Sequence, residues 1–448
     1  MKIQKETKLE TKLEKKLAVL LIENLVEQRT FFAAAIKSSE NFSVITCGNF
    51  KDAFEILIDD HENINFILFN WSSSEVTGNI FAQKIRTNYK YDHIELITFA
   101  QHMSDEDAYL LSELDIHYKI PKIINGNQLI KKLEEIRSDY HLINPILKKI
   151  NELKHYIHME NLEKCEEIIK DEKILHKIKT NHKYLYLKGE ILILRQKYNA
   201  AIDYFHELLK KNHKMNNIET LKTLSTMGKA YCLAGRNKEA LMIFQKLEAK
   251  SPKNLNHKLM TGDAYLGLEE SYKAETKYHE VLDKSPKHKG ALTGMVKANA
   301  IAGKFDVAKS FFDQIEGEFE SRSLASYFNN RGVILIKENK VTEAIAFYKN
   351  ALPFFKKYRG QIHFNIGMAF ARCNKMNEAA KYFNEALHSE GSEFIEDKTL
   401  IKIFKEYGVE KFIDSFKILN PIVIENINRD ENASENRVQT SGFDAKKD

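Results

Sequence analysis

Histidine and cysteine, which are common metal ligands in proteins, occur close together near residue 155. His155 and His158 lie three residues apart, on one face of a predicted helix, and Cys165 follows them. A structural zinc site needs four ligands in a closed geometry, and these three have no fourth companion. Because lysine-rich helices often carry such histidines on the surface, we interpret them as surface residues and predict no metal site.

Nucleophiles in a catalytic setting are also missing from the sequence. The serines of 72–74 follow an apolar run, but no G-x-S-x-G elbow surrounds them. There is neither a G-x-G-x-x-G motif nor a P-loop. The histidines of the first third lack a partnered nucleophile: His61, His93, His102 and His117. We therefore predict that the protein is not an enzyme and has no cofactor.

Composition narrows the class of protein further. A chain of 448 residues is too long for one compact core. Its 68 basic and 63 acidic residues are well mixed, which argues against nucleic acid as a partner. The four cysteines are scattered, which indicates a reducing cytoplasm, and no apolar run is long enough to insert into a membrane. Residues 1–16 are a basic lead-in without the apolar core of a signal peptide.

Apolar strands and amphipathic helices alternate between residues 17 and 137. We predict helices over 26–38, 50–60, 79–88 and 104–113, and a last one that opens at Asn125. The predicted strands between them are 17–22, 42–47, 65–70, 94–99 and a short one near 116–120. Repeated βα units favour an α/β, flavodoxin-like, doubly wound parallel sheet, whose ligand crevice lies beyond the carboxyl ends of the strands.

The rest of the chain is predicted to be helical. The Asn144-Pro145 step marks the boundary, because the residue before a proline is driven out of the helical region. We therefore expect a first domain over 17–140, helical repeats over 145–395, capping helices over 396–420 and a disordered tail over 421–448.

A repeat of about 34 residues organises this helical part. Gly228 and Gly262 are separated by one period, and a small residue and a ring recur at fixed offsets behind each glycine. The small residues are Ala201, Ala240, Ala274, Ala308, Ala344 and Ala379, and the rings are Phe205, Phe244, Tyr278, Phe312, Tyr348 and Phe383. In one unit Val296 replaces the glycine, and a degenerate first unit covers about 146–179. Such units bury their apolar faces only by stacking on neighbours.

This pattern resembles the tetratricopeptide repeat over roughly 182–392. The resemblance implies an all-α superhelix whose concave face, built from each first helix, binds peptide segments or partner helices. It places these residues on the concave face: Lys222, Ser225, Lys229, Asn256, Asp263, Asn329, Val333, Phe364 and Met368. A clamp for a C-terminal carboxylate is incomplete, because Asn330 and Asn365 lack the lysine and arginine that would accompany them.

The first domain resembles the receiver domain of bacterial response regulators. The resemblance lies in VLLIENLVEQR, ILFNWSSSEVTG, LITFA and IPK, which stand where that family has its acidic pair, phospho-accepting aspartate, hydroxyl residue and lysine. A receiver implies a carboxylate that attacks a phosphoryl group beside Mg²⁺. Here Asn70 takes the acceptor position, Glu23 and Asn24 the acidic pair, and Ile120 the lysine position, with Lys119 beside it. Thr98 alone matches, as the hydroxyl residue.

These substitutions favour a pseudo-receiver over an active one. A neutral amide is no acyl-phosphate nucleophile, so we expect neither phosphorylation nor Mg²⁺ in the crevice. The predicted function is a non-catalytic signalling adaptor: its repeat groove binds partner proteins, and its receiver-like domain serves for docking or dimerisation. The alternative is a phosphorylation-controlled response regulator of a two-component system, with the repeats as its output.

Overall fold

The computed structural model describes residues 16–390 and Gly408, apart from 72–76, 100–102, 122–123, 140–144, 180, 212–216, 316–317 and 374. The expected lead-in, apart from Lys16, and the expected capping helices and tail, apart from Gly408, lie outside the described residues. The chain divides into two compact units, Met1–Gly294 and Met295–Asp448, and the division falls within helix α15 (Lys289–Ile301).

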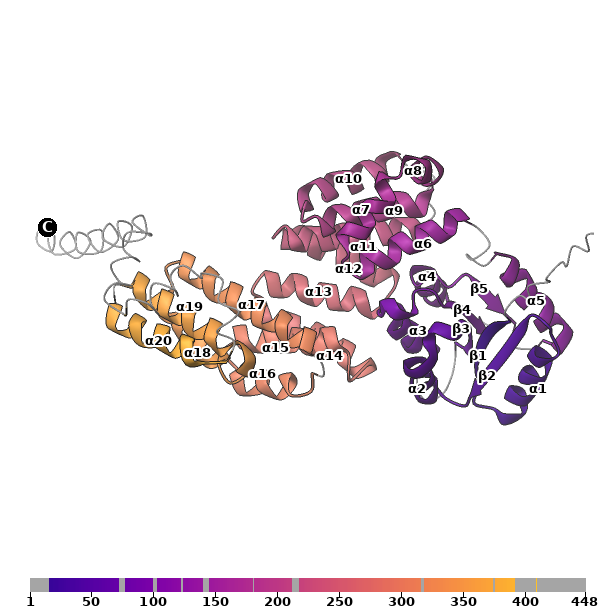
Figure 1. Cartoon of the computed structure of the whole chain (residues 1–448), viewed down its shortest axis with the longest axis horizontal. Helices are drawn as coiled ribbons and strands as arrows, with labels where there is room; N and C mark the ends of the chain where they lie inside the picture. Colours follow the sequence, from indigo (N-terminus) through magenta and orange to yellow (C-terminus); the bar gives the residue numbers. More distant parts are fainter. Residues whose placement is uncertain are drawn as a thin grey trace, which may run out of the picture. The chain divides into compact units, whose positions relative to one another are not determined.

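The first domain is built on a five-stranded parallel sheet in the order β2-β1-β3-β4-β5 (Figure 1). The strands are β1 (Leu17–Ile22), β2 (Phe42–Cys47), β3 (Ile64–Asn70), β4 (Glu95–Phe99) and β5 (Tyr118–Ile120). The order reverses at β1, as in a doubly wound sheet. The predicted flavodoxin-like α/β fold is thereby confirmed.

Helices cover both faces of this sheet. The face formed by Val19, Leu21 and their neighbours packs against α1 (Val26–Lys37) and α5 (Gly126–Asp139). The opposite face packs against α2 (Phe50–Asp60), α3 (Gly78–Arg86) and α4 (Asp105–Glu113). Because successive strand residues point to opposite faces, a strand covered on both sides must be apolar throughout, which explains the run LAVLLI.

Polar caps set the starts of several of these helices. Asn49 and Ser104 each accept a hydrogen bond from a backbone N–H of the first turn, and Asn125 does the same for Gln128 N–H at 2.9 Å. Each cap satisfies a donor that the helix itself leaves unpaired. Three short 3₁₀ turns complete the described elements: η1 (His61–Asn63), η2 (Tyr89–Tyr91) and η3 (Lys356–Tyr358).

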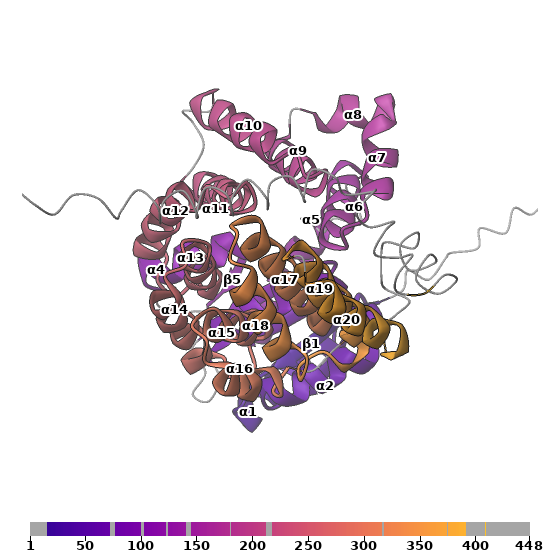
Figure 2. The same ribbon diagram turned by 90° about the vertical axis from the view of Figure 1, so that its left-hand side faces the viewer.

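The remainder consists of antiparallel helix pairs. In the first unit they are α6 (Pro145–His158) with α7 (Leu162–Lys170) and the extra α8 (Glu172–Ile178), α9 (His182–Leu194) with α10 (Tyr198–Lys211), α11 (Asn217–Leu233) with α12 (Asn237–Lys250), and α13 (Leu255–Gly267) with α14 (Ser271–Lys284). Helix α15 pairs with α16 (Phe305–Phe312). The second unit continues with α17 (Glu318–Lys337) and α18 (Val341–Ala351), then α19 (Arg359–Arg372) and α20 (Met376–His388). The successive pairs are visible in Figure 2.

The repeat glycines make room for the repeat rings. A Cβ on Gly228 would lie 2.7 Å from the Phe244 ring, and one on Gly332 would lie 2.1 Å from the Tyr348 ring. Both distances are far below van der Waals contact, so a side chain there would displace the ring that fills the space between the paired helices. The sequence period is thus a packing requirement, and it identifies the tetratricopeptide-like fold.

The unit that carries Val296 is packed differently. Val296 is fully buried, and the ring of Phe312 is only half-buried. This ring instead meets Phe354 and Phe355, each at a centroid distance of 5.5 Å. An aromatic cluster therefore replaces the glycine–ring contact at the start of the second unit.

Within the described residues, no helix is both long and apolar enough to cross a bilayer.

Candidate functional site

The strand-end crevice of the receiver-like domain is the first candidate. Strand register pairs Asn70 of β3 with Phe99 of β4, and Phe99 with Ile120 of β5. Residues in register on neighbouring strands point to the same face. Asn70 is 7% exposed, and Phe99 and Ile120 are each 1% exposed. Along the sheet, Asn70 is therefore followed by two buried apolar side chains, Phe99 on the next strand and Ile120 on the strand beyond it.

This register corrects the expectation for Thr98. Thr98 pairs with Phe69 and Lys119, one step away from Asn70, so its side chain belongs to the opposite face. It is fully buried, and its hydroxyl donates to the Phe99 carbonyl at 3.2 Å. Phe99 occupies the place across from Asn70 and stacks on Phe32 of α1 with centroids 4.7 Å apart.

Glu23 is the one member of the predicted acidic pair that is buried. It is 1% exposed, and Asn24 beside it is exposed. One carboxylate oxygen, Oε1, accepts from Leu25 N–H at 3.1 Å, while Oε2 has no hydrogen-bond partner within the described part of the chain. The neighbouring Arg29 donates from Nη1 to the Glu23 carbonyl at 2.7 Å.

The receiver fold implies Mg²⁺ at this crevice, and the residues present do not fit it. Mg²⁺ in phosphoryl-transfer sites is held by carboxylates together with the substrate phosphate. Glu23 supplies one carboxylate, and an amide stands at Asn70. Among the described residues, no group of three or more histidine, cysteine, aspartate or glutamate side chains is arranged to hold a metal ion. Phosphoryl transfer at Asn70 is therefore not supported by the local chemistry.

A second polar region of the same domain faces the repeats. Glu113, the last residue of α4, is 5% exposed at its side chain. Its Oε1 lies 2.6 Å from His257 Nε2, and its Oε2 accepts from the Ser251 hydroxyl at 2.7 Å and from Asn254 Nδ2 at 2.9 Å. Burial acts to raise the pKa of Glu113, but the hydrogen bonds from these three side chains outweigh it and lower the pKa below its usual value.

Asp115 extends this contact by two residues. Its carboxylate pairs with Lys222 of α11, and its Oδ2 lies 3.2 Å from Lys154 of α6. The residue sits in a turn with φ of 56°, a left-handed conformation that aspartate and asparagine tolerate better than most residues. Burial opposes ionisation, but Lys222 and Lys154 together hold the pKa of Asp115 well below its usual range. Burial also lowers the pKa of Lys222.

The start of α4 and the middle of α3 complete the contact. Lys253 Nζ lies 2.9 Å from Asp107 Oδ1 and 3.8 Å from Glu106. Gln83 of α3 is 7% exposed; its amide donates to the Lys253 carbonyl at 3.2 Å and accepts from Leu255 N–H at 2.7 Å. A buried side chain that satisfies two backbone groups of the repeats fixes the register of the two surfaces.

The histidines first considered as metal ligands belong to another contact of this kind. His158 Nδ1 lies 3.1 Å from Asp92 Oδ2, and His155 Nδ1 lies 3.6 Å from the same oxygen. Cys165 is fully buried in the core of the first helix pairs. The three side chains therefore do not converge on one point.

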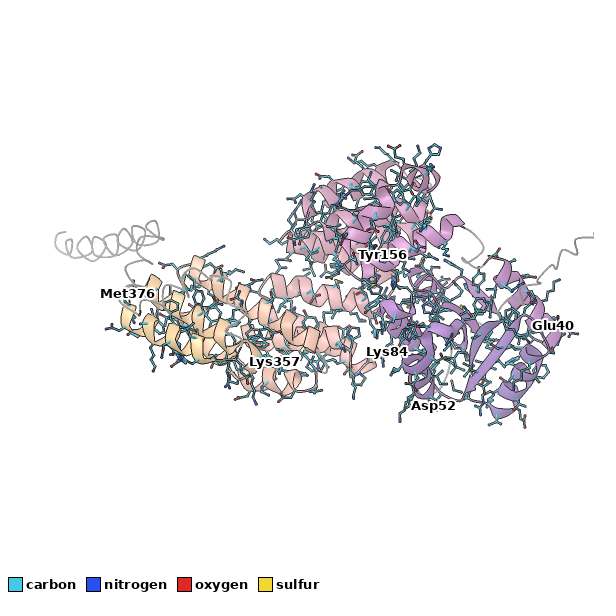
Figure 3. The ribbon with its side chains drawn as sticks, in the orientation of Figure 1. Glu40, Asp52, Lys84, Tyr156, Lys357 and Met376 are labelled. Atoms are coloured by element: carbon cyan, nitrogen blue, oxygen red, sulfur yellow. The ribbon has the colours of Figure 1, made fainter. Side chains whose placement is uncertain are left out.

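The predicted groove residues of the first unit lie along this region. Lys222 binds Asp115, while Ser225, Lys229 and Asn256 line a cavity of about 500 Å³ that residues of α3, the turn after α4 and the repeats surround. Lys84 of α3, labelled in Figure 3, lies at its border. Two polar atoms on its lining, His257 Nδ1 and Ser285 Oγ, are buried and have no partner within the described residues. Asp263 instead accepts a hydrogen bond from Tyr278 at 2.7 Å inside its own repeat.

The predicted groove residues of the second unit divide differently. Asn329 contacts Asn365 of the next first helix, and Val333 is half-buried. Phe364 is 8% exposed and packs on the Phe383 ring at 5.4 Å, with Met368 beside the same core. Phe364, predicted as a groove residue, therefore contributes to the hydrophobic core of its repeat.

Comparisons with known proteins give a family match over part of the chain. The family model described as coatomer epsilon subunit matches residues 173–332, less than half of the chain. No curated protein matches the sequence.

Solved structures resemble the two parts separately. The chemotaxis response regulator CheY4 of Vibrio cholerae is 16% identical over 27% of this chain and 99% of its own, with a TM-score of 0.25. A tetratricopeptide repeat protein from Parabacteroides merdae is 17% identical over 60% of this chain and 98% of its own, with a TM-score of 0.35. A repeat protein of Thermus thermophilus is 16% identical over 48% and 93%, with a TM-score of 0.26. These values are low, and the fold assignment depends on the strand order and helix pairs described above.

Sequence reasoning missed the carboxylates of α4 and the turn after it. Glu113 and Asp115 look like ordinary surface acids at the end of an amphipathic helix. Their partners, Lys222 and His257, lie more than a hundred residues away, and no local pattern links them. Only the inward position of Lys222 in its repeat gave a signal.

Proposed function

We propose that this protein is a non-catalytic adaptor whose helical repeats bind partner proteins and whose receiver-like domain is incompetent for phosphorylation. The observation that carries the proposal is the register at the strand ends, where Asn70, Phe99 and Ile120 stand in one row on β3, β4 and β5. Phosphoryl transfer to a receiver would need a carboxylate, a hydroxyl and a lysine at these three places. An amide, a phenyl ring and an alkyl chain supply none of them.

The repeats support the interaction half of the proposal. Stacked helix pairs expose a continuous row of first helices, and such surfaces hold extended peptides or helices. In the second unit Asn329 and Asn365 adjoin on consecutive first helices, where amides can pair with a peptide backbone. The free cysteines Cys47 and Cys165 are buried and Cys232 and Cys373 half-buried, which is in keeping with a reducing, cytoplasmic setting.

Phosphodonor labelling tests the proposal. The intact protein is incubated with acetyl phosphate and millimolar Mg²⁺ and examined by intact-mass spectrometry. We expect no acid-stable, base-labile adduct. An adduct of one phosphoryl group would overturn the proposal and favour a phosphorylation-controlled regulator.

A titration with Mg²⁺ separates metal binding from phosphorylation. Trp71, the single tryptophan, is 4% exposed and directly follows Asn70, so its fluorescence reports on the crevice. We expect an unchanged signal up to millimolar Mg²⁺. A saturable change would show that the unpaired oxygen of Glu23 recruits the ion, which contradicts the incompetent crevice.

A further inference from the structure

The contact between the receiver-like domain and the repeats has a consistent polarity. Among the described residues, every ion pair that joins α4 or the turn after it to the repeats places an acid on the receiver-like side and a base on the repeat side. We call residues 105–115 the acidic segment. We call the surface that meets it the repeat face, and it consists of Lys154, Lys222, Ser251, Lys253, Asn254 and His257.

We propose that the repeat face is a binding site for acidic helical segments of partner proteins, and that the acidic segment of this chain occupies it as a built-in competitor. The inference rests on the proposed function, because it names the class of partner that the first repeats take. The receiver-like domain shows the pattern that the face recognises: carboxylates at Asp107, Glu113 and Asp115, each with its own set of donors.

The donors of the repeat face recognise carboxylates at particular positions. Three neutral or imidazole donors surround Glu113, and two ammonium groups surround Asp115. Charge-assisted hydrogen bonds of this kind are stronger than neutral ones and depend on geometry. A sequence with the same charge in another order would not place its carboxylates at both positions.

The acidic segment also leaves part of the repeat surface unused. Lys229 is exposed at the neighbouring cavity, and Ser225 and Asn256 line it. The unpartnered atoms His257 Nδ1 and Ser285 Oγ lie on the same lining. A partner segment that fills this cavity makes contacts that the receiver-like domain does not, and this difference can offset the advantage of an intramolecular ligand, whose effective concentration is on the order of millimolar.

The test uses a fluorescent peptide that copies residues 103–117 and the full-length protein. In the variant E113Q/D115N both carboxylates become amides of the same size, and asparagine tolerates the left-handed backbone at 115. We expect fluorescence anisotropy to show that the variant binds the peptide at least tenfold more tightly than the wild type, because the built-in competitor is weakened. Adding K222A/H257A to the variant should abolish binding, and a peptide of scrambled order should bind at least fivefold more weakly.

Hydrogen exchange at 251–257 reports whether the surface is released. If these amides become exposed in E113Q/D115N and the peptide still does not bind, the proposed partner class is wrong. If they stay protected, the carboxylates do not hold the domain, and the proposal is overturned. Equal binding to wild type and variant, or equal binding of the scrambled peptide, would contradict it as well. None of these results depends on phosphodonor labelling, so the two proposals fail separately.

Discussion

The receiver-like domain has two polar regions, and they differ in how many charged side chains they contain. At the strand ends, where phosphoryl chemistry would need carboxylates and a lysine, Asn70 stands in one row with Phe99 and Ile120. Along α4 and the following turn, carboxylates are dense, and they bind side chains of the repeats. A buried charge is stable only when it is paired with other polar groups. The position of the buried, paired carboxylates therefore shows which surface of the domain is built to make contacts. In this domain that surface is the contact with the repeats.

Removal of the Glu113 carboxylate should have the largest effect on stability. In Glu113→Ala, His257, Asn254 and Ser251 lose their common acceptor inside a buried contact. Truncation of one partner in such a site costs about 2–5 kcal/mol. We expect faster hydrogen exchange at 251–257 and a lower midpoint of urea unfolding.

The matched control is Glu135→Ala on α5, whose side chain is 49% exposed and pairs with Lys132. We expect neither its unfolding midpoint nor its exchange at 251–257 to change. Equal effects of the two substitutions would show that the Glu113 contact contributes no more than an exposed pair.

Restoring an acid at the strand ends should be the next largest effect. Asn70→Asp introduces a second buried carboxylate on the strand beside Glu23, and an unsatisfied charged group costs about 1–3 kcal/mol or more. We expect a lower unfolding midpoint that Mg²⁺ partly restores in the variant and leaves unchanged in the wild type, since an ion that binds only the folded state stabilises it.

Asn65→Asp is the control for this substitution. Asn65 lies at the other end of β3, and its Oδ1 accepts from Ala18 N–H at 2.9 Å, which an aspartate oxygen can also do. Its midpoint should be independent of Mg²⁺. A gain with Mg²⁺ in both variants, or in the wild type, would contradict the view that the crevice needs a carboxylate at position 70 to bind the ion.

The two regions also differ in how far the sequence predicts them. The sheet, the helix pairs and the substitution at Asn70 follow from local patterns, because strand alternation and the 34-residue period are written in neighbouring residues. Register is harder to read: Thr98 was assigned one step from the residue that faces Asn70, and a single-residue shift reverses the face.

The contact with the repeats depends on distant residues and could not be predicted in this way. Glu113 and His257 are 144 positions apart, and each is unremarkable among its neighbours. Phe364 shows the same limit. Whether a concave position of a repeat is buried or exposed depends on the ring that the following helix places against it. Tertiary packing decides these cases, and one sequence does not record it.

Acid should weaken the contact with the repeats. The pKa values of Glu113 and Asp115 are lowered in the fold, so their contribution is fully present above the unfolded values and is lost as the pH falls through the folded ones. We expect exchange at 251–257 to be constant from neutral pH down to about 4.5, the unperturbed value for glutamate, and to rise below it after correction for intrinsic rates. The variant E113Q/D115N should lack this rise. A rise of the same size in the variant would show that other groups are responsible.

The smallest effect is expected at the partly exposed rim of the contact, in comparison with its buried centre. Lys253 pairs with Asp107, but its side chain is 35% exposed, whereas that of His257 is 2% exposed. Exposed pairs contribute about 0–1 kcal/mol because solvent screens them. Lys253→Gln should therefore shift the unfolding midpoint far less than His257→Gln, and added salt should erase the difference between Lys253→Gln and the wild type. If Lys253→Gln costs as much as His257→Gln, long-range charge rather than buried hydrogen bonding would hold the receiver-like domain to the repeats. The acidic segment would then be recognised by its net charge, and the scrambled peptide should bind as well as the native one.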